Sequence, residues 1–216
     1  MLRVHPSIGV IYSDAARLFG ARVQPEAIEH SFQELWNKTA PLVSNEGHRL
    51  TYEKERDWWK YLVWEVFKDL IQFKDFEAFF DYLYVRFEHS DSWCLYEDVL
   101  EVLEYLRSNN VTLAIVSNWD SRLPSLIDRL GISSFFHSMV ISSLVGYEKP
   151  HPAIFQIALE RTQLVSEEVL YVGDDPYLDY QAAKKAGLHS LHLDRDRRFP
   201  DHQERITSLH EVLDRL

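Results

Sequence analysis

With 216 residues, the chain is long enough for one sizeable core or for a core with a modest helical subdomain, and its 46% hydrophobic and 26% charged residues are ordinary for a globular protein. A net charge of −11 excludes nucleic acid or an anionic membrane as a partner recognised through a broad basic surface. The single cysteine, Cys94, excludes an intrachain disulfide, and the absence of a signal peptide or of an apolar run of about 18 residues predicts a cytoplasmic protein without a membrane span.

The first part of the chain predicts helices only. Apolar residues recur with helical spacing in four segments, near residues 8–19, 28–36, 62–70 and 76–87, and no strand is expected in residues 8–87. Gly20 is well placed to end the first of these helices. The helical spacing favours core packing over substrate contact for four tryptophans of this stretch, namely Trp36, Trp58, Trp59 and Trp64.

From about residue 97, strands alternate with helices. Short apolar runs predict buried strands at residues 113–116, 139–141, 169–172 and 191–193. Helices are expected at about residues 99–107, 121–130 and 154–159, and again after Pro176, with Gly131 and Gly187 ending two of them. This alternation predicts an α/β fold with a parallel, doubly wound sheet.

Polar residues gather where two of the predicted strands end. In an open parallel sheet, ligands bind beyond the carboxyl ends of the strands. One strand runs into Ser117-Asn118 and another into Asp174, while Lys149 lies in a loop between them, directly before a helix. We therefore expect Ser117, Asn118 and Lys149 to hold phosphate oxygens, and Asp174 together with Asp179 to bind a divalent cation such as Mg²⁺.

Each of these residues also has a simpler structural interpretation. Ser117-Asn118 can cap the next helix, and Lys149 alone can be a solvated surface charge. Asp174 and Asp179 can interact with a helix dipole. Together these readings are less favoured, because all the residues would have to fall in order at one sheet edge by chance. Asp175, which directly precedes Pro176, is expected to be the N-cap of the following helix.

The same segments resemble the haloacid dehalogenase-like (HAD) hydrolase superfamily. "LAIVSNWD" is similar to the second motif of that superfamily, "GYEKPHPAIFQIAL" to the third and "YVGDDPYLDYQAAKKAG" to the fourth, over about residues 96–193. His151 departs from the pattern, which usually has Asp there. The resemblance implies a Rossmann-like α/β core at residues 91–216 with an inserted all-helical cap at residues 21–90, residues 1–20 being a remnant of the core's N-terminal segment that leads into the cap.

The resemblance also implies a reaction. An aspartate attacks a phosphate ester, an aspartyl-phosphate forms, and a second aspartate two residues later serves as general acid and base, with Mg²⁺ as cofactor and a small phosphorylated metabolite as substrate. Both acids belong to a D-x-D-G-T-like motif that this chain lacks. The only candidate, Asp14 in "GVIYSDAARL", falls on the polar face of a helix. We therefore expect that the sequence begins too late to include the nucleophile and that this chain is inactive.

The missing strand has a structural consequence, since the first strand of that superfamily is central in the sheet. Its absence would leave unpaired backbone groups on two neighbours, each costing about 1–3 kcal/mol. A stability of about 5–15 kcal/mol would not survive many of these. We expect either a longer native protein or a segment that fills the gap, from residues 1–4 or from a partner chain, so that a monomer and a homodimer with an exchanged segment both remain open.

Two other functions remain open. A 2-haloacid dehalogenase shares the fold and the Ser, Lys and Asp positions without a metal, but the paired acids after Gly173 favour Mg²⁺ chemistry. The other alternative is a catalytically inactive HAD-fold protein that acts as a binding or regulatory module, and this function follows if the gene encodes no nucleophile. A receiver-type signalling domain is set aside, because its acid pair comes first in the chain. For any substrate, Trp119 is better placed for contact than the tryptophans of the helical stretch.

Overall fold

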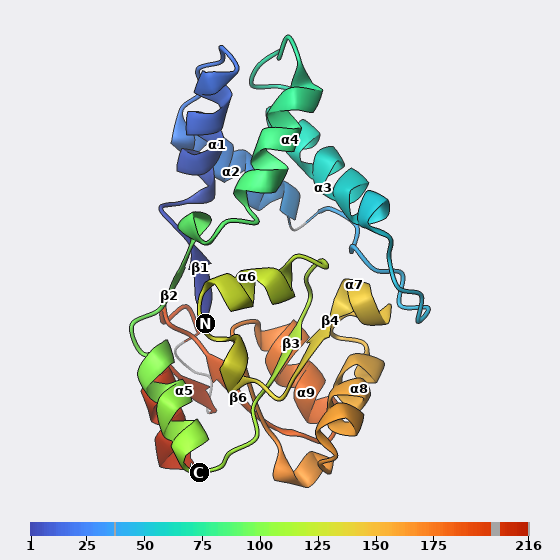
Figure 1. The fold of residues 1–216 in the computed structure, drawn as a ribbon, viewed down its shortest axis with the longest axis vertical. Coiled ribbons are helices and arrows are strands. Elements are labelled where there is room, and N and C mark those ends of the chain that lie inside the picture. Colours follow the sequence, from blue (N-terminus) through green and yellow to red (C-terminus); the bar gives the residue numbers. More distant parts are fainter. Residues whose placement is uncertain (37, 200–203, 216) are drawn as a thin grey trace. The chain divides into compact units, whose positions relative to one another are not determined.

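The computed structural model describes residues 1–36, 38–199 and 204–215, which divide into two compact units (Figure 1). The helical unit is built from Met1–Leu42, Leu50–Tyr96 and Ser125–Leu130. The α/β unit is built from Val43–Arg49, Glu97–Pro124 and Gly131–Leu216. None of the described helices has the length and apolar character needed to cross a membrane.

Four helices make up most of the helical unit, and the described part of residues 8–87 contains no strand, as predicted. The helices are α1 (Ile8–Leu18), α2 (Pro25–Trp36), α3 (Tyr52–Phe67) and α4 (Phe76–Arg86). Three begin after a residue whose side chain accepts a hydrogen bond from a first-turn backbone N–H: Ser7, Thr51 and Asp75. Gly20 follows α1 with a φ of +79°, which confirms its predicted place at the helix end.

Aromatic rings fill the core of the helical unit. Tyr12 of α1 packs against Phe32 of α2 and Phe67 of α3, with ring centroids 6.1 Å and 5.9 Å away. The tryptophan prediction is half right. Trp58 and Trp59 pack against this core, but Trp36 and Trp64 are 49% and 47% exposed. Helical spacing indicates a face, and a large ring at the border of that face remains partly in solvent.

Two short strands in the helical unit were not expected. β1 (Leu2–Val4) pairs antiparallel with β2 (Trp93–Leu95), which follows the short 3₁₀ segment η1 (Ser90–Ser92). Three residues are too few for an alternating pattern to be read from the sequence. Because β1 pairs with β2, residues 1–4 do not join the sheet of the α/β unit. Residues 1–4, the nearby segment that could have filled the place of a central strand, therefore belong to the two-stranded sheet of the helical unit instead.

The α/β unit alternates strands and helices, as predicted. Its strands are β3 (Ala114–Ser117), β4 (Ser138–Ile141), β5 (Leu170–Gly173), β6 (His189–Leu193) and β7 (Arg205–Ile206). Its helical segments are α5 (Val99–Ser108), the start of α6 (Leu123–Arg129), η2 (Ser133–Phe135), α7 (Ser142–Val145), α8 (Pro152–Thr162), η3 (Ser166–Glu168), η4 (Pro176–Gln181), α9 (Ala182–Lys185) and η5 (Leu209–Arg215). Every strand pair in this unit is parallel, which confirms the predicted sheet type.

The parallel sheet is divided into two pieces. β3 pairs with β4, and β5 pairs with β6, which pairs with β7. Within the described residues no hydrogen-bonded strand connects β3 to β5. Central strands of parallel sheets are normally buried on both faces. Here every residue of β5 is only partly buried, as are Val116 and Ser117 of β3, so both strands are less covered than central strands should be.

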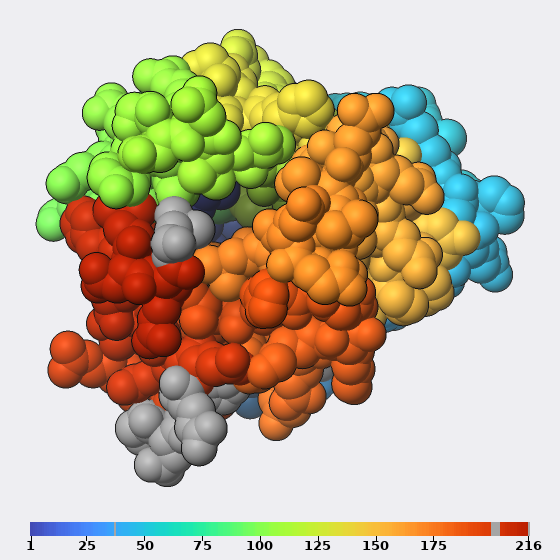
Figure 2. Space-filling view, turned by 90° about the horizontal axis from the view of Figure 1, so that it is seen from below, coloured from blue at the N-terminus to red at the C-terminus, as the bar shows by residue number. Residues whose placement is uncertain are grey.

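Side chains hold the α/β unit together around this divided sheet. Val140 of β4 packs with Ile154 and Phe155 of α8, all three fully buried. The Asp98 carboxylate, just before α5, accepts two hydrogen bonds of 2.8 Å from the Arg195 guanidinium and one of 2.7 Å from the Leu209 N–H. This contact ties α5 to η5, whose green and red segments lie side by side in Figure 2.

Candidate active site

The Lys149 loop is fixed against the end of β3 by one side chain. The Asn118 amide oxygen accepts a hydrogen bond of 2.7 Å from the Lys149 N–H, and its amide nitrogen donates one of 2.9 Å to the Lys149 carbonyl. Both polar ends of Asn118 are thus engaged with the Lys149 main chain. Neither Ser117 nor Asn118 caps a helix, since α6 begins only at Leu123.

The Lys149 side chain lies at the centre of a buried polar network. Its ammonium donates hydrogen bonds of 2.6 Å to Asp179, 3.1 Å to the Tyr171 hydroxyl and 3.3 Å to the Val116 carbonyl. The side chains of Lys149 and Asp179 are only 11% and 6% exposed. Lys149 is therefore not a solvated surface charge, and the segments that end β3 and begin η4 meet at it.

Electrostatics keep this network ionised despite its burial. Burial disfavours the charged form of Lys149, but the negative charge of Asp179 and the hydrogen bonds to Asp179 and the Tyr171 hydroxyl outweigh it, so the pKa of the ammonium is raised. Burial likewise opposes ionisation of Asp179, but Lys149 lowers the pKa of that carboxyl. Burial, with the neighbouring Asp179, raises the pKa of Tyr171, whose hydroxyl stays protonated and donates to Asp179 at 2.9 Å. The site thus holds a buried ammonium–carboxylate ion pair near neutral pH.

The stretch after β5 shapes this network. Asp175 is the N-cap of η4, as predicted, because its carboxylate accepts hydrogen bonds of 2.7 Å from the N–H groups of Tyr177 and Leu178. η4 is a π-helical turn, which is often found at functional sites. Gly173 allows Asp179 to approach, since a Cβ on Gly173 would lie 2.3 Å from the Asp179 carboxyl carbon.

Two predicted site residues present polar groups without a partner in the described part of the chain. Neither the Ser117 hydroxyl nor the Asp174 carboxylate makes a hydrogen bond or ion pair there, and the structure brings no three His, Cys, Asp or Glu residues together as a metal cluster. An oxygen ligand such as the Asp174 carboxylate suits a hard cation. Asp179, by contrast, is engaged at both oxygens, with Lys149 at one and the Asp175 N–H at 3.0 Å at the other.

Trp119 follows Asn118 and is held through its backbone. Its N–H donates to the Ser142 hydroxyl at 3.0 Å, and its ring is half-buried. The next residue, Asp120, is fully buried and forms an ion pair of 2.7 Å with Arg122. Sequence reasoning missed this pair and also Tyr171. The only signals available were an acid two residues before an arginine and a tyrosine inside a predicted strand.

A loop from the segment between α2 and α3 also holds the Lys149 loop. The Asn45 side chain accepts a hydrogen bond of 2.7 Å from the Glu148 N–H, and the Gly47 N–H donates to the Gly146 carbonyl at 3.1 Å. Burial raises the pKa of the Glu148 carboxyl, although the Val43 N–H partly offsets this effect. Lys149 is therefore positioned by hydrogen bonds to its loop from two directions.

His151 takes a structural role at the position where the sequence departs from the family pattern. Its Nδ1 accepts a hydrogen bond of 3.2 Å from the Ala153 N–H, so His151 caps α8. Its ring also stacks on Tyr147, with centroids 4.8 Å apart. The imidazole therefore supplies the acceptor that a carboxylate would supply at an N-cap.

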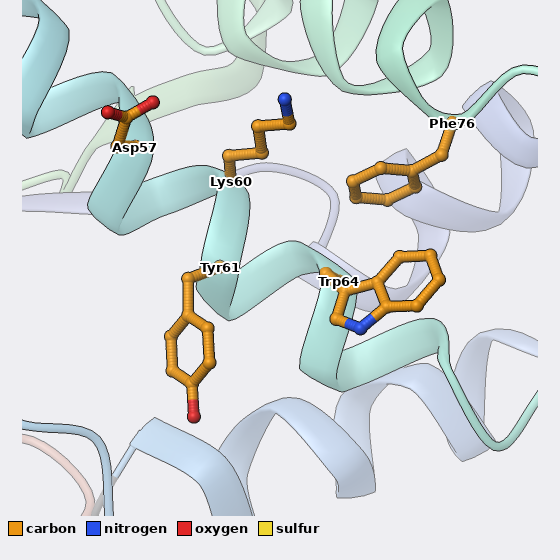
Figure 3. Close-up of a pocket in the computed structure, with 5 residues that line it drawn as sticks. All are labelled: Asp57, Lys60, Tyr61, Trp64 and Phe76. Carbon is orange, nitrogen blue, oxygen red and sulfur yellow. The ribbon is translucent and has the colours of Figure 1, made fainter.

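A separate pocket lies in the helical unit and contains none of the predicted site residues. Asp57, Lys60, Tyr61 and Trp64 of α3 and Phe76 of α4 line it (Figure 3). The rings of Trp64 and Phe76 meet edge to face, 5.0 Å apart.

Comparison with known proteins points in the same direction as the geometry. A family model described as haloacid dehalogenase-like hydrolase matches residues 6–187. The chain is 31% identical over 196 residues to haloacid dehalogenase-like hydrolase domain-containing protein 3 of Homo sapiens, covering 88% of this chain and 76% of that protein. It is 39% identical over 101 residues to glyceraldehyde 3-phosphate phosphatase of Methanopyrus kandleri, covering 46% and 43%.

A solved structure extends the likeness to the fold. The crystal structure of magnesium-bound YfnB from Bacillus subtilis superposes with a TM-score of 0.70 at 22% identity, covering 97% of this chain and 92% of that one. At this identity the likeness concerns the fold alone. With the family model matching most of its length and a relative above 30% identity, this chain belongs to the haloacid dehalogenase-like hydrolase family.

Proposed function

We propose that the α/β unit carries the phosphate-binding half of a Mg²⁺-dependent phosphatase site for a small phosphorylated metabolite. One observation carries the proposal. The charged, buried Lys149 lies at the carboxyl ends of β3 and β5. Ser117 is the last residue of β3, and Asp174 directly follows β5. Neither the Ser117 hydroxyl nor the Asp174 carboxylate makes a hydrogen bond in the described part of the chain. A cation, a hydroxyl donor and a hard-metal ligand are the groups that a phosphoryl dianion requires.

Each residue has a distinct role in this proposal. The Ser117 hydroxyl donates to a phosphate oxygen, and the Lys149 ammonium donates to another by exchanging its long 3.3 Å hydrogen bond to the Val116 carbonyl, while Asn118 fixes the Lys149 backbone. Asp174 is the proposed metal ligand, and a bound Mg²⁺ would offset phosphate charge. Asp179 was predicted as a second ligand, but its contacts favour a positioning role through Lys149. Trp119 is the proposed substrate contact.

We further propose that the chain binds phosphate esters without hydrolysing them. Covalent phosphatase chemistry needs a carboxylate that attacks phosphorus, and the carboxylates close to Lys149 in the described residues are engaged or are needed for the metal. Asp14 does not supply one, because it is 62% exposed on α1 and pairs with Arg17 at 3.3 Å. Hydrolysis of p-nitrophenyl phosphate with Mg²⁺ that is lost in Asp14→Asn would contradict this part of the proposal.

The binding claim is tested by calorimetric titration of inorganic phosphate, with and without Mg²⁺. Ser117→Ala should weaken binding about tenfold to a hundredfold, as expected for one hydrogen bond to a charged group. Asp174→Asn should abolish the gain that Mg²⁺ gives. Matched controls are Ser134→Ala, at an exposed serine of η2, and Asp196→Asn, at an aspartate 76% exposed. Equal affinities for Ser117→Ala, Asp174→Asn and both controls would refute the site.

A second candidate is a HAD-fold protein that binds a phosphorylated ligand or regulates a partner without catalysis. The observation that favours it is the pairing of Asp179 with Lys149, which leaves Asp174, the proposed metal ligand, as the acid without a partner among the described residues of the site. Phosphate binding without turnover, even after an attacking carboxylate is supplied, would favour this candidate over the phosphatase.

A further inference from the structure

A buried histidine near the end of β6 contacts the main chain of a proposed site residue. His192 is fully buried, and its Nε2 donates a hydrogen bond of 3.2 Å to the Asp174 carbonyl, since a carbonyl oxygen can only accept. In the paired register of β5 and β6, His192 lies opposite Gly173, the residue directly before Asp174. The hydrogen bond therefore joins β6 to the first residue beyond β5.

The peptide bond between Asp174 and Asp175 is held at both of its polar groups. Its carbonyl accepts from His192, and its N–H, which belongs to Asp175, donates to one carboxylate oxygen of Asp179 at 3.0 Å. The other oxygen of Asp179 accepts from the Lys149 ammonium. A peptide unit is planar, so two hydrogen bonds on its opposite edges fix its orientation. We call the two side chains His192 and Asp179, with the peptide that they hold, the peptide clamp.

The Asp174 carboxylate depends on the peptide clamp for its position. The residue is exposed, and its carboxylate makes no hydrogen bond or ion pair with any residue that the structure describes. No side-chain contact among those residues therefore orients it. An aspartate side chain is short and adopts few rotamers on a fixed backbone. The main chain of Asp174, which the clamp holds, thus determines where the carboxylate lies.

His192 is itself held in place. Its backbone N–H donates to the Glu204 carbonyl at 2.9 Å, just before β7, and its ring packs against Phe199 with centroids 5.2 Å apart. Burial of a polar ring is unfavourable unless the ring is hydrogen-bonded, and an apolar side chain would fill this position without that cost. The hydrogen bond to the Asp174 carbonyl offsets the cost, and it acts on the main chain of the proposed site.

We propose that His192 is a positioning residue, which holds the Asp174 carboxylate in place for a hard divalent cation through the peptide clamp. The role of Asp174 as a metal ligand in this inference rests on the proposed function. Groups that hold a metal ligand without touching the metal strongly influence metal affinity. The Lys149 ammonium keeps its hydrogen bonds to Asp179 and Tyr171 when His192 is changed. Loss of His192 should therefore weaken metal binding and leave phosphate binding without a metal unchanged.

Mn²⁺ is the probe, because carboxylates bind it as they bind Mg²⁺, and the EPR signal of the free ion measures its affinity for the full chain. His192→Leu removes the donor and should weaken Mn²⁺ binding at least about tenfold. His192→Gln should restore most of the affinity, since its amide nitrogen can take the place of Nε2. The control is His189→Leu, at the exposed histidine that begins β6, which should bind Mn²⁺ like the unmodified chain. Inorganic phosphate without a metal should bind all these chains equally, which a general loosening of the unit would not allow.

Hydrogen exchange of the Asp175 N–H tests the peptide clamp without any metal. His192→Leu should speed this exchange about fivefold, as loss of one hydrogen bond predicts, and His192→Gln should return it to the original rate. Exchange of the Ala153 N–H, which His151 caps, should not change in either variant.

Three results would overturn the inference. They are unchanged exchange at Asp175 in His192→Leu, equal losses of Mn²⁺ and phosphate affinity in that variant, and a His192→Gln variant that behaves like His192→Leu. An Asp174→Asn variant separates the inference from the proposed function. If it binds Mn²⁺ as tightly as the unmodified chain, the proposed metal ligand is wrong, and the exchange of Asp175 still decides whether the clamp exists.

Discussion

Removing either charge from the buried Lys149–Asp179 pair should destabilise the α/β unit strongly. The two side chains are 11% and 6% exposed and their charged atoms are 2.6 Å apart, so Lys149→Met leaves a buried carboxylate and Asp179→Asn leaves a buried ammonium. Breaking one side of such a pair costs about 3–5 kcal/mol. The double variant should recover at least about 2 kcal/mol relative to the sum of the single losses, because neither charge is then stranded.

These free energies of unfolding are measured by urea titration of protein labelled with 5-fluorotryptophan. The ¹⁹F resonance of Trp119 reports on the α/β unit, because Trp119 is the tryptophan that lies in the segments of that unit. The matched control is the Lys184–Glu204 pair, in which both side chains are 46% exposed. Lys184→Met and Glu204→Gln should each cost no more than about 1 kcal/mol. Single losses at Lys149 and Asp179 as small as those of the control, or a strictly additive double variant, would refute the buried-network reasoning.

Two further predictions concern the scaffold of the α/β unit. Although burial opposes it, Arg195, with the Leu209 N–H and the Ser208 hydroxyl, lowers the pKa of Asp98 from 3.8 to about 2. This shift corresponds to about 2 kcal/mol of stability, which is present above about pH 4 and lost as the pH falls through 2. In urea unfolding, Asp98→Asn should therefore lower stability at pH 7 but hardly at pH 2, and a pH-independent loss would contradict the assignment. Gly146→Ala should speed amide exchange at His48, because the added Cβ would lie 2.3 Å from the His48 nitrogen. Gly131→Ala is the control, since Gly131 has a similar φ but no atom within 4 Å of the added Cβ, and it should leave the exchange at His48 unchanged. Equal effects of the two variants would mean that backbone strain alone is responsible.

Much of the fold could be predicted because it rests on short-range patterns. The apolar runs gave the parallel strands β3, β4 and β5 within a residue of their observed ends. The glycines predicted at helix ends, Gly131 and Gly187, have φ values of +74° and +88°. Such signals depend on hydrophobic burial and on the conformational freedom of glycine, both of which are visible in a single sequence.

The details of the site depended on contacts that no local pattern encodes. Asn118 was expected at phosphate but is engaged with the Lys149 backbone, 31 residues away in the chain. Asp179 was expected at a metal but pairs with Lys149, 30 residues away. The turn that brings Asp179 back beneath Gly173 is π-helical, and sequence patterns do not predict such turns. Residue type and order indicated the chemistry of the site, while tertiary packing decided which partner each group has.

An amide-resolved NMR titration of the uniformly ¹⁵N-labelled chain with inorganic phosphate and Mg²⁺ tests most directly whether Ser117, Lys149 and Asp174 form one phosphate site. We expect saturable shifts at the amides of these three residues and of Asn118, with none at the exposed Ser134. Shifts that cluster instead at Trp64 and Phe76 in the helical unit, or no shifts at all, would contradict a phosphoryl site at the ends of β3 and β5.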